Sequence, residues 1–182
     1  DFWGFLKKTV RIQLLVFITS FLILGIPANA NVKLAGVLSG NMVIQRNHEI
    51  AVWGMADKGE RVSVTFNKLV KKIKADAAGK WKIVFPEMQA GGPYDMIVQG
   101  KNTIKLENIL IGDVWVCSGQ SNMAMALKSV NDAQNEVQQA NYPSIRLITI
   151  PRNFQKEEVP DVEGGSWTLC SPESVPNFSA VA

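Results

Sequence analysis

Histidine, cysteine and charge are scarce in this sequence of 182 residues, and each shortage excludes a class of chemistry. His48 is the only histidine, so a Ser-His or Cys-His pair, or a multi-histidine metal site, must use it or go without. Two cysteines are too few for a disulfide scaffold. Charged residues make up 19% of the chain and hydrophobic residues 47%, which excludes intrinsic disorder for most of it. No metal-ligand spacing, phosphate loop or dinucleotide motif is present, so we expect neither a metal nor a cofactor.

The first thirty residues carry the three parts of a secretory signal peptide. Three basic residues, the last of them Arg11, precede an uncharged run at residues 12–26, and residues 28–30 (ANA) follow with small side chains at both ends. The run is shorter than the ~20 apolar residues that a bilayer-spanning helix needs. An uncleaved anchor or a buried core helix is the alternative interpretation. We expect cleavage after Ala30, export to the periplasm or the exterior, and no membrane contact beyond the export signal.

Charge is unevenly divided along the remainder of the chain. Residues 31–108 hold 12 Lys and Arg against 7 Asp and Glu, whereas residues 109–182 hold 4 against 8. Such an asymmetry predicts two modules. A basic group lies within an expected strand hairpin and consists of Lys68, Lys71, Lys72 and Lys74. We interpret this group as a solvated strand face and expect no nucleic-acid partner.

Residues 31–108 have the pattern of short strands separated by turns. Val62, Val64 and Phe66 alternate with polar residues, which is the period of a half-buried strand. Turn sequences such as residues 57–60 and 76–80 recur along the module. No segment with a helical period interrupts the strands. We therefore predict that residues 31–108 form an antiparallel β-sandwich.

From residue 109 the pattern changes to strand, helix and strand. Residues 109–117 (ILIGDVWVC) are almost continuously apolar, which is typical of a strand covered on both faces. Residues 122–140 place apolar side chains close to a helical period, and Pro143 stops that helix. Residues 145–150 (IRLITI) form the next expected strand. One such crossover starts a parallel sheet but cannot complete one, so we expect residues 109–182 to be the first part of a truncated α/β domain.

Ser121 lies between that first strand and its helix, in the turn Ser118-Gly119-Gln120-Ser121. Ligands of open parallel sheets bind at the carboxyl ends of the strands. The free N–H groups at a helix N-terminus stabilise an oxyanion, so a serine there suits a nucleophile whose own N–H donates to that oxyanion. Serine is also a common N-cap, and position alone leaves the capping interpretation open.

Residues 112–123 (GDVWVCSGQSNM) resemble the nucleophile block of the sialate O-acetylesterases, which are exported carbohydrate esterases of the SGNH-hydrolase group. Three segments before it, residues 38–46 (LSGNMVIQR), 52–54 (VWG) and 91–94 (GGPY), resemble the small β domain that precedes the esterase domain in bacterial members. Residues 167–182 resemble the family segment that leads into the next helix. The resemblance implies an SGNH/flavodoxin-like α/β domain, with Ser121 as nucleophile beside Asn122.

The family chemistry implied by this resemblance is removal of acetyl groups from sialic acid or related acetylated carbohydrates. The family's base is a histidine far downstream, oriented by an aspartate, and neither block is present here. The sequence also begins with Asp1 instead of Met. We therefore expect a piece of a longer esterase that is inactive alone. The rival interpretation is a non-catalytic carbohydrate-binding or domain-contact module, in which the serine only caps a helix.

Other candidate side chains have simpler interpretations. His48 lies in a polar turn before a strand, and we expect it to be solvated. Cys117 is expected to pack as a small apolar residue, and its pairing with Cys170 stays open. Asp113 could orient a base, but we expect it to bind backbone groups at the start of its strand. Aromatic residues of the β module could form a sugar-stacking platform, although core positions are the favoured interpretation for Trp53, Trp81 and Tyr94.

Overall fold

A computed structural model describes residues 31–151, 156–157, 159, 161–162 and 164–182, which belong to the compact unit Asn31–Ala182. The predicted export signal at residues 1–30 lies outside the described residues. Within the described ranges, no helix is both long and apolar enough to cross a lipid bilayer.

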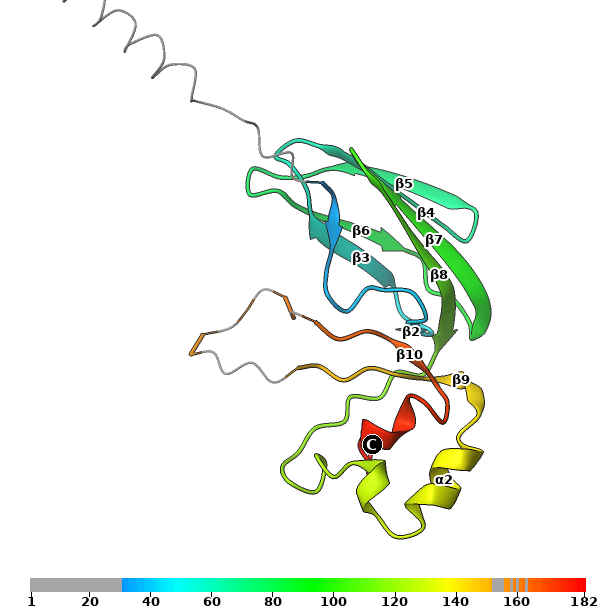
Figure 1. The fold of residues 1–182 in the computed structure, drawn as a ribbon. Coiled ribbons are helices and arrows are strands. Elements are labelled where there is room, and N and C mark those ends of the chain that lie inside the picture. The colour runs from blue at the N-terminus through cyan, green and yellow to red at the C-terminus, as the bar shows by residue number, and fades with distance from the viewer. Residues whose placement is uncertain (1–30, 152–155, 158, 160, 163) are drawn as a thin grey trace, which may run out of the picture. The chain divides into compact units, whose positions relative to one another are not determined.

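The described chain is mostly β-sheet, as its strand and turn pattern predicts (Figure 1). The strands are β1 Lys33–Leu34, β2 Val43–Gln45, β3 Ile50–Met55, β4 Arg61–Phe66, β5 Leu69–Lys74, β6 Lys80–Phe85, β7 Gly91–Gln99, β8 Thr103–Gly112, β9 Tyr142–Leu147 and β10 Thr168–Cys170. The helical elements are short: the 3-10 turns η1 Leu127–Ser129 and η2 Val175–Asn177, and the α-helix α2 Ala133–Gln139.

Two sheets enclose one hydrophobic core. One sheet has the strand order β1-β3-β6 and the other β2-β8-β7-β4-β5, and Figure 1 shows them as two layers. Buried side chains from both sheets form a single cluster that includes Val52 and Phe85 from the first and Phe66 and Ile109 from the second. In β4, the predicted alternation is confirmed, because Val62, Val64 and Phe66 are buried and the residues between them are not.

One strand pair departs from the predicted antiparallel arrangement. β2 runs parallel to the end of β8, with Val43 opposite Leu110 and Gln45 opposite Gly112. The N–H of Leu110 donates to the carbonyl of Met42 over 3.0 Å. At the other end of this strand pair, the N–H of Arg46 donates to the carbonyl of Gly112 over 2.8 Å. The short strand β2 thus provides hydrogen-bond partners for backbone groups of β8 that would otherwise lie unpaired at the edge of the sheet.

The prediction that residues 109–117 form one strand is wrong. Ile109 and Ile111 are buried in the core as the last part of β8, which ends at Gly112. The rest of the apolar run lies outside any strand, and Trp115 and Val116 are 84% and 92% exposed. The apolar run therefore joins two unlike segments, and the predicted boundary at residue 108 falls inside β8.

The predicted helix at residues 122–140 is also shorter than expected. Only α2 is α-helical, and it has no buried residue. Its Val137 packs on a small cluster of Ala140, Cys170 and Val175, together with the partly buried side chains of Leu127 and Leu147. Because helices in proteins owe most of their stability to a packed apolar face, so small a cluster supports only about two turns.

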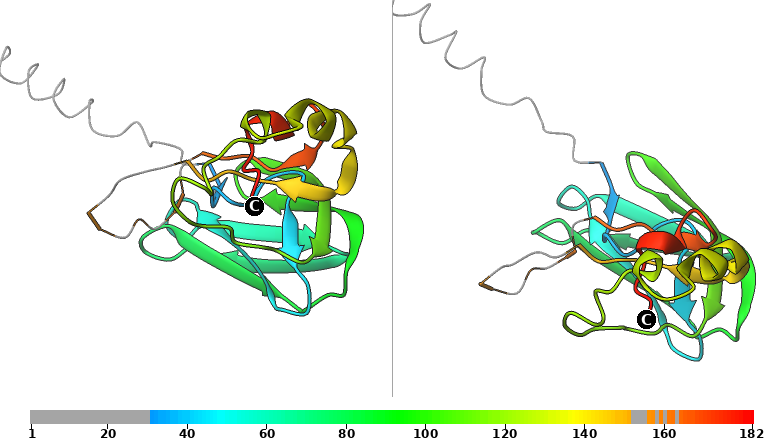
Figure 2. Two further views of the ribbon diagram at one scale, coloured as in Figure 1. Left: turned by 90° about the horizontal axis from the view of Figure 1, so that it is seen from below. Right: turned by 60° about the horizontal axis from the view of Figure 1, so that its bottom comes forward.

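The strand predicted at residues 145–150 begins earlier, and its partner differs from the one expected. β9 pairs antiparallel with β10, with Leu147 opposite Thr168. Figure 2 shows this hairpin beside α2 and η2. After β9 the chain makes a long connection and returns as β10, which pairs antiparallel with β9. The described residues therefore contain no parallel β-α-β crossover. Sequence spacing cannot reveal such a pairing.

Candidate active site

Ser121 lies in the segment between the end of β8 at Gly112 and the start of η1 at Leu127. Figure 1 shows this segment as a green loop that leaves β8. Ser121 is part of a single helical turn. In this turn, the N–H of Ala124 donates to the carbonyl of Gln120 over 3.2 Å, and the N–H of Met125 donates to the carbonyl of Asn122 over 3.1 Å. The side chains of Ser118, Gln120, Ser121 and Asn122 are exposed, and so is Gly119. The predicted helix start is thus present only as one turn.

The upstream end of this loop is fixed to the β2 edge of the sandwich. The Nε of Arg46 donates to Oδ1 of Asp113 over 2.8 Å, and the N–H of Val114 donates to Oε1 of Gln45 over 2.8 Å. Both contacts lie at the point where β8 ends. They determine the direction in which the chain leaves the sheet towards Ser121.

The downstream end is fixed by the last residues of the chain. The N–H of Leu127 donates to the carbonyl of Phe178 over 2.9 Å, and the N–H of Ala180 donates to the carbonyl of Met125 over 2.9 Å. The Oγ of Ser179 also lies 3.5 Å from the sulfur of Met123. Residues 115–122 therefore form an exposed loop between two anchored ends.

This arrangement offers a reachable hydroxyl next to free amides. The Oγ of Ser121 has no hydrogen-bond partner among the described residues, and the N–H groups of Ser121 and Asn122 are not used in the turn. Free amides at the start of a helical turn can donate to a negatively charged oxygen. The loop can thus present a nucleophile and part of an oxyanion hole.

No base lies against Ser121 in the described part of the chain. His48 is exposed in the turn between β2 and β3, as predicted, and forms no described hydrogen bond. The carboxylate of Asp113 pairs with Arg46 and accepts no backbone N–H among the described residues, so the expectation that it binds backbone groups is wrong. No group of three or more potential metal ligands occurs among the described residues.

The cysteines and aromatic residues are divided between core and surface. Cys117 is exposed and Cys170 is buried, and both are free. The prediction that Cys117 is a packed residue is therefore wrong. Trp81 is buried in the core and Tyr94 packs against it, whereas Trp53 is 36% exposed on β3, so the core assignment fails for Trp53.

Sequence reasoning missed the two residues that hold the loop at its start. Gln45 and Arg46 lie 67 or more positions before their partners. Their only signal was indirect, because both belong to residues 38–46, a segment that resembles the family's β domain. A polar contact between such distant residues has no local pattern.

Known proteins resemble the chain in sequence and in structure. It is 31% identical over 158 residues to the sialate O-acetylesterase of Rattus norvegicus, across 80% of this chain and 29% of that protein. It is 31% identical over 148 residues to the sialate O-acetylesterase of Homo sapiens, across 74% of this chain and 28% of that protein. No protein-family model matches the chain.

The crystal structure of a carbohydrate acetylesterase from Xanthomonas citri has a similar fold. It matches with a TM-score of 0.80 and 32% identity, across 82% of this chain and 35% of that one. The chain spans less than a third of the length of the curated relatives that it matches. Because the similarity covers most of this chain in sequence and in fold, the chain belongs to the sialate O-acetylesterase family.

Proposed function

We propose that this chain supplies the nucleophile of a serine esterase that removes O-acetyl groups from sialic acid or related acetylated carbohydrates. The observation that carries the proposal is the exposed turn at Ser121, whose hydroxyl and neighbouring amides are free among the described residues. The names of the relatives support acetylesterase chemistry. The acetylated carbohydrate is the proposed substrate, and the reaction needs no metal or cofactor.

The proposed reaction has two steps. The Oγ of Ser121 attacks the acetyl carbonyl carbon and loses its proton to a base, while the sugar oxygen leaves and takes up a proton. The acetyl group is then bound to Ser121 as an ester. Water hydrolyses this ester, which gives acetate and restores the serine. In both steps, the amides of the turn donate to the carbonyl oxygen as it becomes negatively charged.

We propose that the chain alone does not perform this reaction at a useful rate. General-base assistance is typically worth about 10²- to 10⁴-fold, and a serine hydroxyl is a poor nucleophile without it. His48 is exposed and unbonded in a turn of the sandwich, so the described residues hold no candidate to assist Ser121. In our proposal the base belongs to a part of the whole esterase outside these 182 residues.

We also propose that the loop after β8 belongs to an SGNH-type α/β domain in the whole protein. Trp115 and Val116 form an apolar pair that is almost fully exposed here, which suits a strand that needs further chain to cover it. The basic, apolar and small-residue segments of residues 1–30 support export of the protein, with membrane contact only through this signal.

The test compares Ser121→Ala with Ser118→Ala in the whole protein. Acetate release from an O-acetylated sialic acid should fall by about 10³-fold or more in Ser121→Ala, while Ser118→Ala should keep most of it. The matched variant removes a hydroxyl from the same exposed loop. Full activity of Ser121→Ala would overturn the nucleophile assignment and favour the non-catalytic module. Rapid acetate release by the 182-residue chain alone would overturn its proposed dependence on an outside base.

A further inference from the structure

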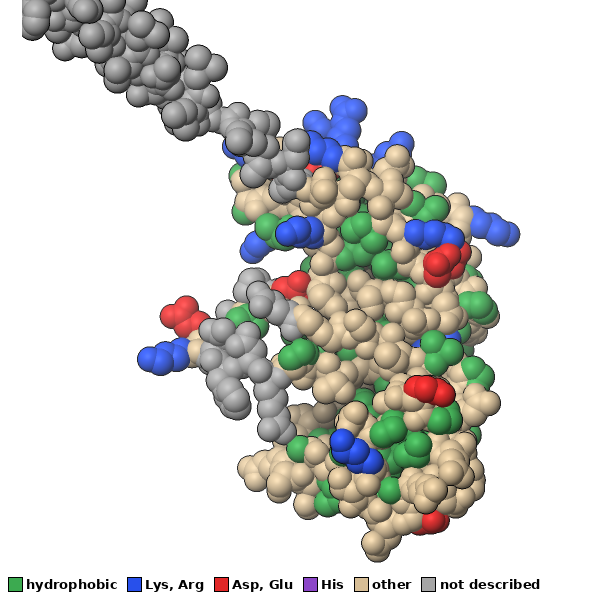
Figure 3. Space-filling view, viewed as in Figure 1, with side chains coloured by type: hydrophobic (Ala, Val, Ile, Leu, Met, Phe, Trp, Pro, Cys, Tyr) green, Lys and Arg blue, Asp and Glu red, His purple; other side chains and the backbone are tan. Residues whose placement is uncertain are grey.

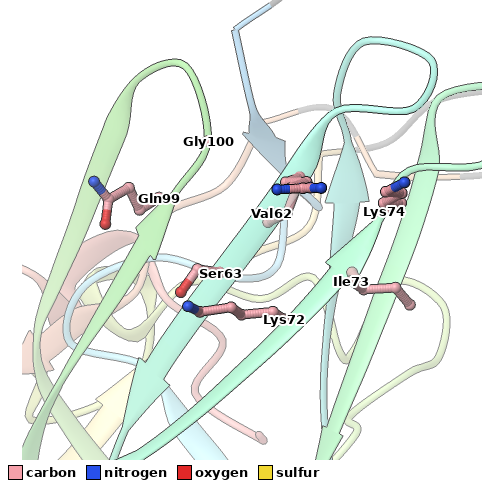
Figure 4. A pocket seen from close by; sticks show the side chains of 8 residues that line it. Val62, Ser63, Lys72, Ile73, Lys74, Gln99 and Gly100 are labelled. Carbon is pink, nitrogen blue, oxygen red and sulfur yellow. The ribbon is translucent and has the colours of Figure 1, made fainter.

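A hollow of about 570 Å³ lies on the outer surface of the larger sheet, over β4, β5 and the end of β7 (Figure 4). It is separate from the loop that carries Ser121. Three cations line it, Arg61, Lys72 and Lys74, together with the polar side chains of Ser63 and Gln99. The surface around this open hollow is therefore positively charged.

The strand register brings these side chains together. Arg61 lies directly opposite Lys74, and Ser63 lies opposite both Lys72 on β5 and Gln99 on β7. Residues directly opposite in an antiparallel pair point to the same face of the sheet. Two adjacent rows across three strands thus present three positive charges and two hydrogen-bonding groups to solvent.

Arg61, Lys72 and Lys74 take part in none of the ion pairs described within this part of the chain, which use Arg46, Lys101 and Lys105 instead. The carboxylate of Glu60 lies nearby and accepts the N–H groups of Asp57 and Lys101, so three cations face one neighbouring carboxylate. Like charges directly opposite on paired strands repel each other, so the Arg61–Lys74 pair is relieved by an added anion.

The row next to the basic one is apolar. Val70 and Ile97 lie on either side of Thr65 in the register, and their side chains are 56% and 39% exposed. Figure 3 shows Lys and Arg side chains gathered over the sandwich half of the visible face. A cationic row beside an exposed apolar row suits a ligand that carries a carboxylate on a body with apolar C–H faces.

We propose that this hollow binds the carboxylate of an acidic carbohydrate, at a site distinct from the Ser121 loop. The guanidinium of Arg61 can bind a carboxylate through two parallel N–H donors, while Lys72 and Lys74 add point charges. Ser63 and Gln99 lie beside them to bind sugar hydroxyls. The choice of a carbohydrate as the carrier of the charge rests on the proposed function, whereas the preference for an anion rests on the hollow alone.

The experiment is calorimetric titration of the full chain with oligogalacturonate, and with the same oligomer after complete methyl esterification. The triple variant Arg61→Gln, Lys72→Gln, Lys74→Gln should weaken binding of the acid form by about tenfold or more. The control is Lys33→Gln, Lys80→Gln, Lys82→Gln, which removes the same charge from the smaller sheet. It should change the affinity by no more than about twofold at 0.15 M salt, where distant charges are screened.

Three results would overturn the proposal: equal affinity for the acid and the esterified oligomer, an unaffected triple variant, or an equal loss in the control. Thermal unfolding of both variants shows whether they are folded. The outcome is independent of the Ser121 proposal, because acetate release by the whole protein from a small neutral ester should be the same in the triple variant as in the unmodified protein.

Discussion

Arg46 and Asp113 form an ion pair of 2.8 Å that joins the turn after β2 to the first residue after β8. Both side chains are about half exposed, so the pair adds only about 0–1 kcal/mol to stability. Its importance is geometric, because it acts together with Gln45 at the point where the chain leaves the sheet towards Ser121. The β2 edge thus directs the segment that carries the proposed nucleophile.

Replacement of Gln45 should loosen this segment. Gln45→Ala removes the oxygen that accepts the N–H of Val114 over 2.8 Å. Because a hydrogen bond contributes about 0.5–1.5 kcal/mol net, we expect amide exchange at Val114 to become about two- to tenfold faster. Hydrogen exchange followed by NMR measures this rate. Gln45→Glu keeps an acceptor oxygen and should keep the slow exchange, and equal rates in the wild type and Gln45→Ala would contradict the assignment.

The sandwich core should depend strongly on Phe66. Its ring lies 5.9 Å from those of Phe85 and Tyr94, edge-on to both, and it is 1% exposed. We expect Phe66→Ala to lower the free energy of unfolding by about 3–5 kcal/mol, because it leaves a cavity between the two sheets. Urea denaturation is the measurement. Trp53→Ala, on the outer side of β3, is the aromatic control and should cost about 1 kcal/mol; similar losses would place the core elsewhere.

The sandwich strands were predictable because their signals are local. Alternation in β4 follows from the geometry of a single strand. The turns at residues 57–60 and 76–80 are each closed by a local hydrogen bond, from the N–H of Glu60 to the carbonyl of Asp57 and from the N–H of Gly79 to the carbonyl of Asp76. The parallel pairing of β2 with β8 was not predictable in this way. It depends on which edge of the sheet remains free once the other strands have paired, and no run of neighbouring residues records that.

The predictions after β8 failed for a related reason. Ile109 and Ile111 face the core while Trp115 and Val116 face solvent, yet all four belong to one apolar run. Hydrophobicity predicts that a segment will be buried, but it does not say against which partner. The tight turn predicted at residues 118–121 lies slightly later, because the hydrogen bonds of the turn join Gln120 to Ala124 and Asn122 to Met125.

Arg146 offers a test of a partly buried cation. Its Nη2 donates to Oδ1 of Asn108 over 3.2 Å, but Nε and Nη1 are buried without a partner among the described residues. This burial lowers the pKa of the guanidinium. Because unpartnered buried donors cost free energy, we expect Arg146→Met to leave the chain as stable as the wild type or more stable by about 1 kcal/mol.

Urea denaturation of the 182-residue chain measures the effect of Arg146→Met. Arg146→Lys is the control, since it keeps the positive charge but loses the planar donor fork that reaches Asn108, and it should be less stable than Arg146→Met. A loss of about 2 kcal/mol or more in Arg146→Met would show that the guanidinium has a stabilising partner after all.

Substitution of Trp115 and Val116 should leave the stability of the 182-residue chain unchanged but lower the stability of the whole esterase. They are 84% and 92% exposed here, so Trp115→Ser with Val116→Ser should leave the Tm of the chain unchanged and reduce its self-association. If further chain covers this segment in the whole protein, as we propose, each substitution there removes about 1.5–3 kcal/mol of apolar burial. Thermal unfolding and light scattering measure the two effects, and Met55→Ser, at an exposed position of β3, should behave alike in both proteins. An unchanged Tm in the whole protein would mean that the loop stays uncovered, and the proposed α/β domain would then have to be built without it.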